Sequence, residues 1–355
     1  MVNVNEAEEN QGKSEFYHLW YQPGWYLLLA SGILPPILLW ITGTWLFPLT
    51  TIETSLLIIG YLFAFFMWFW YFIHSMMSGL SRWPVETKSD QVTIESIEIP
   101  VGGGRVLKGD IFKSSRTPEK NAKTVIISHG LGGSRTDFYF LAIAGVFRGF
   151  AVVVYDSRGH GDNDWGEKWE TRSIITDHSK VVDFVLTRDD LSHTEIIAIG
   201  GSMGGGVVLN EAYLDRRVKF IIGLCTWADF DKTANRKMNN FSEKVVKIMY
   251  LVMGINLDPS PLQNRMVSPI YNSFNRKKGF FDHPVPWDVD NTYRVMLGHC
   301  KDDMVIDYHQ YEINSEFLKL PPENLVSFDA GNHPFAKMES AVLGKIFYWL
   351  DSRNF

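Results

Sequence analysis

The chain has 355 residues, which is enough for one large domain with additional elements. Its 40 acidic and 34 basic residues give a formal net charge of −6, so electrostatics argue against nucleic acid as a partner. The two cysteines, Cys225 and Cys300, lie in apolar stretches and form neither a disulfide framework nor a zinc-binding spacing. We therefore expect two reduced core cysteines and no metal or other cofactor.

Two long apolar stretches lie near the start of the chain. Residues 1–24 form a polar tail whose first part is acidic, and no Asp, Glu, Lys or Arg occurs from residue 16 to residue 52. Residues 25–47 and 55–73 are apolar, and each is close to the ~20 residues that a helix needs to cross the hydrocarbon of a bilayer. The sequence therefore predicts two transmembrane helices within residues 25–77, with the lipid bilayer as a partner.

The short segment between the two predicted helices sets their orientation. Residues 48–54 contain no Lys or Arg, whereas the flanking sequence contains Lys13, Arg82 and Lys88. The positive-inside rule then predicts a two-pass integral membrane protein whose following domain faces the cytoplasm, and unpaired cysteines agree with a reducing compartment. A buried helical hairpin in a soluble protein is the alternative. A cleaved signal peptide fits poorly because the preceding residues are acidic and a second apolar stretch follows.

After a linker at residues 78–90, short strands alternate with helices through residues 91–355. The first two predicted strands are joined by Val101–Gly104 and form a hairpin. The later strands are apolar runs, which predict a mostly parallel sheet covered on both faces. Strands are expected at residues 91–100, 106–113, 124–128, 151–155, 196–199, 220–225, 294–297 and 325–328. Helices are expected at residues 135–147, 172–186, 241–253, 308–318 and 337–350.

Three reactive side chains directly follow predicted strands. They are Ser202, Asp302 and His333. The carboxyl ends of strands in such a sheet border the crevice in which ligands bind. A serine hydroxyl is a poor nucleophile near neutral pH and needs a base, and the pKa of histidine suits that base. A carboxylate on the other ring nitrogen fixes the tautomer and stabilises the imidazolium. These residue types are typical of nucleophilic catalysis.

The motifs around these residues resemble those of the α/β-hydrolase superfamily. Gly200–Gly204 fits the G-x-S-x-G turn between a strand and a helix, in which small neighbours are needed. The other motifs are HG-x at 129–131, R-G-H-G at 158–161, D-x-x-V at 302–305 and Gly-Asn-His at 331–333. The resemblance covers approximately residues 91–355. The motifs are most similar to the serine-aminopeptidase and monoglyceride-lipase-like branch, with prolyl-peptidase-like proteins as the alternative.

The resemblance implies a fold and a set of roles. The expected α/β fold is a mostly parallel sheet with helices on both faces, and residues 228–292 occupy the position of the family's cap insertion. Ser202 is the implied nucleophile, His333 the general base and acid, and Asp302 the acid that orients the histidine. Asp303 is the competing acid, but it does not fit the D-x-x-V spacing as Asp302 does.

The same resemblance implies an oxyanion hole and assigns two further histidines to structure. The backbone amides of Met203 and Leu131 are the implied donors to the developing negative charge. His160, within R-G-H-G, is expected to stabilise its loop. His299 is expected to pack in the domain and not to act as a base.

Together these expectations predict a membrane-anchored serine hydrolase that cleaves carboxylic esters through an acyl-enzyme. A lipid acyl ester is the preferred substrate, because the anchor holds the site beside the bilayer and the cap combines an apolar helix face at 241–253 with a basic run at 276–278. That face and that run are equally consistent with packing on the sheet and with solvation. A membrane-bound serine peptidase with the same triad and a catalytically silent binding protein are the alternatives, and the oligomeric state is left open.

Overall fold

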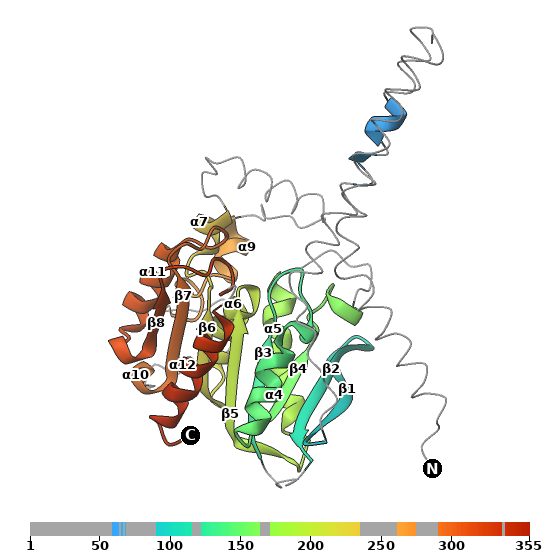
Figure 1. The fold of residues 1–355 in the computed structure, drawn as a ribbon, viewed down its shortest axis with the longest axis vertical. Coiled ribbons are helices and arrows are strands. Elements are labelled where there is room, and N and C mark those ends of the chain that lie inside the picture. The colour runs from blue at the N-terminus through green and yellow to red at the C-terminus, as the bar shows by residue number, and fades with distance from the viewer. Residues whose placement is uncertain are drawn as a thin grey trace. The chain divides into compact units, whose positions relative to one another are not determined.

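The computed structural model of the chain separates into two compact units, Met1–Ser81 and Arg82–Phe355. The residues that the structure describes are 59–63, 65–66, 68, 90–115, 122–163, 171–234, 261–274, 290–335 and 338–355 (Figure 1).

The described residues of the first unit are helical. They are apolar and open to solvent: the exposed fractions of Ile59, Leu62 and Phe63 are 62%, 58% and 67%. The remainder of the two predicted membrane spans, 25–47 and 55–73, lies outside the described residues. Among the positions that are described, no helix combines the length and the apolar character needed to cross a bilayer.

The second unit is built around an eight-stranded sheet with the order β1-β2-β4-β3-β5-β6-β7-β8. The pairs β1/β2 and β2/β4 are antiparallel, and the other neighbouring pairs are parallel. The strands are β1 Val92–Gly102, β2 Arg105–Ser114, β3 Ala122–Ser128, β4 Ala151–Tyr155, β5 Leu191–Gly201, β6 Val218–Leu224, β7 Val295–Cys300 and β8 Leu325–Phe328. The predicted opening hairpin and mostly parallel sheet are confirmed.

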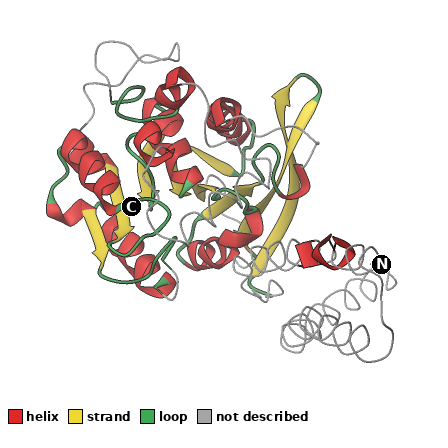
Figure 2. Ribbon diagram, turned by 90° about the horizontal axis from the view of Figure 1, so that it is seen from above, coloured by secondary structure: helices red, strands yellow, loops and turns green. Residues whose placement is uncertain are grey.

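Helices cover both faces of this sheet (Figure 2). The α-helices are α4 Tyr139–Phe147, α5 Thr171–Val185, α6 Met203–Val207, α7 Phe230–Ala234, α9 Pro261–Met266, α10 Asn291–Arg294, α11 Tyr308–Leu318 and α12 Glu339–Asp351. Four further turns of helix are η1 Arg135–Phe138, η2 Gly161–Asn163, η3 Val208–Ala212 and η4 Pro322–Asn324.

The two core layers follow from the alternation of side chains along the central strands. Ile126 of β3 packs in the layer that contains the apolar side chains of α5, η3 and α11. The next residue, Ile127, points to the opposite face and packs in the layer with α4 and α12. Because both faces are covered, the parallel strands need continuous apolar sequence, as in Ala151–Tyr155, where every residue is buried.

The expected helix at 135–147 is present in two pieces. It begins with the tight turn η1, where Ser134 and Asp137 form a capping box and the Asp137 carboxylate accepts the Ser134 amide at 3.0 Å. The regular helix α4 starts only at Tyr139. The capping residues therefore set the first turn, which hydrophobic periodicity alone does not reveal.

The described parts of the predicted cap, residues 228–292, are tied to the sheet domain. The Val267 carbonyl accepts the Trp227 indole N–H at 2.8 Å and the Asn210 side-chain amide at 2.9 Å. The predicted helix at 241–253 lies outside the described residues.

The π-helical turn η3 carries a buried acidic side chain. Glu211 in this turn is 2% exposed, and His178 of α5 is fully buried. Burial, together with the negative charge of Asp215, raises the pKa of Glu211 to about 8. Burial lowers the pKa of His178 to about 4, and within the described part of the chain neither of its ring nitrogens has a hydrogen-bond partner. Both groups are therefore neutral in the folded chain near pH 7.

We predict that Glu211→Gln makes the free energy of unfolding less dependent on pH. The folded chain keeps a proton on Glu211 that the unfolded chain loses above its ordinary pKa of 4.5, so native stability falls as the pH rises toward a folded pKa of about 8. The loss is at most roughly 5 kcal/mol, and glutamine cannot undergo it. Urea unfolding of both chains at about pH 5 and about pH 9 measures the difference. If the free energy of unfolding fell by the same amount in both chains between about pH 5 and about pH 9, the prediction would be contradicted.

Candidate active site

Ser202 lies in a turn that only small neighbours permit. It follows β5 and precedes α6, with φ 54° and ψ −116°, a backbone conformation that is rare outside glycine. A Cβ on Gly200 would lie 2.0 Å from the Gly204 carbonyl oxygen, and a Cβ on Gly204 would lie 2.0 Å from the Ser128 carbonyl oxygen. The two glycines therefore let β5, α6 and β3 meet, and Ser202 stands at the end of the sheet with 8% of its surface exposed.

Ser202, His333 and Asp303 form one continuous chain of hydrogen bonds. The Ser202 hydroxyl donates to His333 Nε2 at 2.8 Å, and His333 Nδ1 donates to Asp303 Oδ2 at 2.8 Å. These partners fix the imidazole as the tautomer that can accept the serine proton. The structure thus brings together Ser202 and His333, as predicted from the sequence.

The carboxylate of Asp303 is held in its charged form by several donors. Its Oδ1 accepts the backbone amides of Val305 at 2.8 Å and Ile306 at 2.9 Å. Its Oδ2 also lies 3.3 Å from Nε2 of the buried His299. Burial alone would raise the pKa of Asp303, but the hydrogen bonds from His299 and His333 outweigh it and hold this pKa well below its usual range.

The expectation that Asp302 orients the histidine is wrong. Asp302 is exposed and faces the loop before the histidine, where its carboxylate accepts the amides of Asn332 at 2.7 Å and Gly331 at 3.2 Å. The adjacent Asp303 turns inward because its Oδ1 caps the two amides that follow it. Neighbouring side chains in such a turn point in different directions, so the D-x-x-V spacing selected the wrong one of two adjacent carboxylates.

Comparison with known proteins bears on this arrangement. A family model described as the alpha/beta hydrolase fold matches residues 123–250. An esterase of Pyrococcus furiosus superposes with a TM-score of 0.51 at 20% identity, covering 76% of this chain and 96% of its own. The chain has the α/β-hydrolase fold. An acylaminoacyl peptidase of Pyrococcus horikoshii is also similar, with a TM-score of 0.52 at 15% identity, covering 74% of this chain and 42% of its own.

Among curated proteins, an uncharacterized 31.7 kDa protein of Escherichia coli from the traX-finO intergenic region is 33% identical over 143 residues. The match covers 38% of this chain and 48% of that protein. The chain therefore spans about half the length of this protein and of a second Escherichia coli protein of the same description.

In this α/β-hydrolase fold, the start of α6 and the loop after β3 both lie beside Ser202. Met203 is the first residue of α6, so its amide has no acceptor within its own helix. In the loop after β3, a Cβ on Gly130 would lie 3.4 Å from Cβ of Ser202 and 3.9 Å from its hydroxyl oxygen. Leu131 follows in that loop. The structure thus places the helix start and this loop beside the serine, and the role of the Met203 and Leu131 amides as oxyanion donors stays a prediction.

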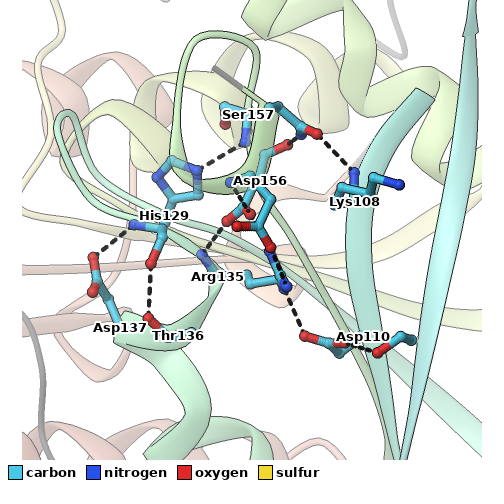
Figure 3. A network of polar contacts seen from close by, with 12 residues as sticks. Lys108, Asp110, His129, Arg135, Thr136, Asp137, Asp156 and Ser157 are labelled. Carbon is cyan, nitrogen blue, oxygen red and sulfur yellow. Dashed lines mark hydrogen bonds and ion pairs between the residues drawn. The ribbon is translucent and has the colours of Figure 1, made fainter. Parts of the chain in front are cut away.

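The loop that carries Leu131 is anchored by His129. His129 Nδ1 donates to the Gly130 carbonyl at 2.7 Å, and its Nε2 accepts the Ser157 amide at 2.8 Å (Figure 3). Burial, with the nearby His160 and Arg135, lowers the pKa of His129 to about 3. His129 is therefore a neutral structural link between the loops after β3 and β4.

Arg135 reinforces the same link with charge (Figure 3). Its guanidinium pairs with Asp110 of β2, at 2.6 Å from Nε, and with Asp156 after β4. It also pairs with Asp162 at 2.8 Å, and its backbone amide donates to Asp156 at 2.7 Å. In the adjoining R-G-H-G turn, His160 Nδ1 donates to the Arg158 carbonyl at 2.7 Å, in keeping with the loop-stabilising role expected for it.

Sequence reasoning missed three features of the site. The D-x-x-V spacing favours Asp302 over Asp303 as the acid. No motif indicates the contact of His299 with Asp303, and the charge network centred on Arg135 carries no short motif. A run of Asp-Ser-Arg-Gly-His after a buried strand signals a polar loop, but the partners on β2 come from residues too distant in sequence to be inferred.

We predict that Gly200→Ala prevents stable folding. Its Cβ would be placed 2.0 Å from a carbonyl oxygen of the backbone, which cannot move as a flexible side chain does. We expect a loss of at least about 3 kcal/mol in the free energy of unfolding. The matched control is Gly344→Ala in α12, where a Cβ meets nothing within 4 Å, and this change should leave stability equal or raise it by up to about 1 kcal/mol. Urea unfolding checks both, and equal stability of the two variants would contradict the crowding at the serine turn.

Proposed function

We propose that the chain is a serine hydrolase that cleaves carboxylic esters through an acyl-enzyme intermediate. The observation that carries the proposal is the hydrogen-bonded series from Ser202 through His333 to Asp303, with 2.8 Å at each step. These are the distances over which a base can take the proton of a nucleophile and be oriented by an acid.

The proposed reaction has two halves. In the first, Ser202 Oγ attacks the ester carbonyl carbon while His333 Nε2 takes the hydroxyl proton, and the oxyanion is met by the amides of Met203 and Leu131. The imidazolium then gives that proton to the leaving alcohol, and Ser202 holds the acyl group. In the second half, water attacks the acyl-enzyme with the same proton transfers and restores the serine. Asp303 keeps the imidazole in the required tautomer and stabilises its charge throughout.

A lipid acyl ester is the substrate class that we propose. Met203, next to Ser202, belongs to a buried apolar cluster with Val207, Trp227, Phe230 and Val267, against which the partly buried Leu131 and Val305 pack. The charge-free residues 16–52 and the apolar helical residues described from Ile59 onward support an N-terminal anchor in a bilayer. A domain anchored at the cytoplasmic surface of the membrane would meet lipid esters at high local concentration.

Peptide hydrolysis by the same triad and a silent binding role are the competing functions. The similarity to a peptidase is at 15% identity and speaks only to the fold, so it favours neither bond type. The experiments below therefore separate ester from amide hydrolysis as well as enzyme from binding protein.

We predict that a fluorophosphonate probe labels the full-length chain and fails to label Ser202→Ala. The exposed Ser352 at the end of α12 supplies the control, and Ser352→Ala should label as wild type does. The wild-type chain without probe should hydrolyse p-nitrophenyl acyl esters, with rates that increase as the acyl chain lengthens. It should leave aminoacyl anilides largely intact. Ser202→Ala should reduce kcat/KM by about 10⁴-fold or more. A preference for anilides would favour the peptidase, and an unlabelled wild type the binding protein.

We predict that Asp303→Asn lowers kcat for ester hydrolysis by about 10³- to 10⁴-fold, because the amide cannot hold the required tautomer of His333. Asp302→Asn should cost about tenfold or less, because one of its two hydrogen bonds to the histidine loop can still form. Steady-state kinetics on the two variants measures the ranking. The opposite ranking would restore Asp302 as the orienting acid.

A further inference from the structure

A thiol lies beside the acid and the base of the triad. Cys225, Asp303 and His333 each offer one ligand atom, and these atoms all lie within 4.8 Å of one another. The three residues come from different loops: Cys225 directly follows β6, Asp303 follows β7 and His333 follows β8. No short sequence spacing connects them, which is why the sequence pointed to no metal site.

The Cys225 side chain is held at this place. It is fully buried, and its backbone amide donates to the Gly298 carbonyl of β7 at 2.7 Å. Both cysteines are free thiols. The buried thiol is the one member of this set that has no role in the ester hydrolysis proposed above.

This donor set suits a soft divalent cation. Thiolate, imidazole and carboxylate are the side chains that bind zinc, and the preferred number of ligands is four, so one position would be left for water or for the serine oxygen. Zinc bonds of about 2.0–2.3 Å place ligand atoms about 3–4 Å from one another, so the longest separation in the cluster needs to shorten by about 1 Å. One thiolate and one carboxylate balance the two charges of the ion, which lowers the cost of placing it in a buried site.

We propose that Cys225, Asp303 and His333 form a site for a divalent zinc-type cation that switches the triad off. On binding, the ion replaces the thiol proton of Cys225, which passes to the solvent, and it accepts lone pairs from the carboxylate and from one imidazole nitrogen. If that nitrogen is Nδ1, the ring proton moves to Nε2, and if it is Nε2, the ion occupies it. In both cases Nε2 can no longer accept the proton of Ser202. The inhibitory part rests on the proposed function, whereas the cation site does not.

The site is tested without activity by using Co²⁺ as the probe. Full-length Ser202→Ala, treated with a chelator and dialysed, is titrated with Co²⁺, and the thiolate-to-cobalt charge-transfer absorption is recorded. We expect this band to saturate at one Co²⁺ per chain, to be displaced by Zn²⁺, and to be absent when Cys225→Ser is added. No band with the folded Ser202→Ala chain, or a band that survives Cys225→Ser, overturns the proposal.

Inhibition is tested on the active chain with Zn²⁺ and a p-nitrophenyl ester. Each chain's rate is expressed relative to its own zinc-free rate, and a chelator should restore that rate in the wild type. We expect at least tenfold weaker inhibition in Cys225→Ser. The control is His309→Gln, because His309 and Glu312 form an exposed pair 3.0 Å apart that offers zinc an alternative ligand pair on the surface. Inhibition that is lost in His309→Gln, or unchanged in Cys225→Ser, overturns the proposal. A cobalt band in a chain without esterase activity would instead remove the proposed function and leave the cation site standing.

Discussion

The close approach of three backbone segments at the end of β5 is the constraint on which the site depends. Gly200 and Gly204 leave no space for a Cβ, and Ser202, midway between them, is held with a positive φ. Such a conformation costs free energy, of the order of 1–3 kcal/mol, which the packing of β5 against β3 and β6 must outweigh. The histidine, the acid and the two neighbouring loops are useful only because this turn fixes where the serine hydroxyl lies.

Two adjacent carboxylates divide the support of the histidine between them. Asp303 is buried and contacts the imidazole, and the amides of Val305 and Ile306 and the ring of His299 keep it ionised in a place where burial opposes charge. Asp302 is exposed and holds the backbone of the loop that carries the imidazole. A single turn after β7 therefore orients His333 through its ring and through the backbone of the two residues before it.

The sequence predicted the sheet well and the site only in part. Continuous apolar runs such as Ala151–Tyr155 indicated where strands lie, because a strand that is buried on both faces must be apolar at every position. Ser202 and His333 followed from motifs at strand ends. The choice between Asp302 and Asp303 did not, because it depends on how one turn folds over its own amides.

Other features of the structure could not be predicted because they depend on contacts between residues that are far apart in the sequence. The position of Cys225 beside the triad is set by the pairing of β6 with β7, and the partners of Arg135 are brought together by the neighbouring strands β2 and β4. The π-helical turn that buries Glu211 has no local sequence signature either. In each case the partner is chosen by tertiary packing and not by spacing along the chain.

The sheet order separates the strand that receives the preceding chain from the strands that bear the reacting groups. β1 is one edge, β5 lies within the sheet, and β8, which leads to His333, is the opposite edge. A mechanical pull on the chain at residue 90 is borne first by the ladder between β1 and β2. Asp110 on β2, through its pairing with Arg135, connects the hairpin to the loop that carries Leu131, and Glu95 on β1 pairs with Arg188 just before β5. Tension applied at the hairpin would therefore be transmitted both to that loop and to the strand that leads to Ser202.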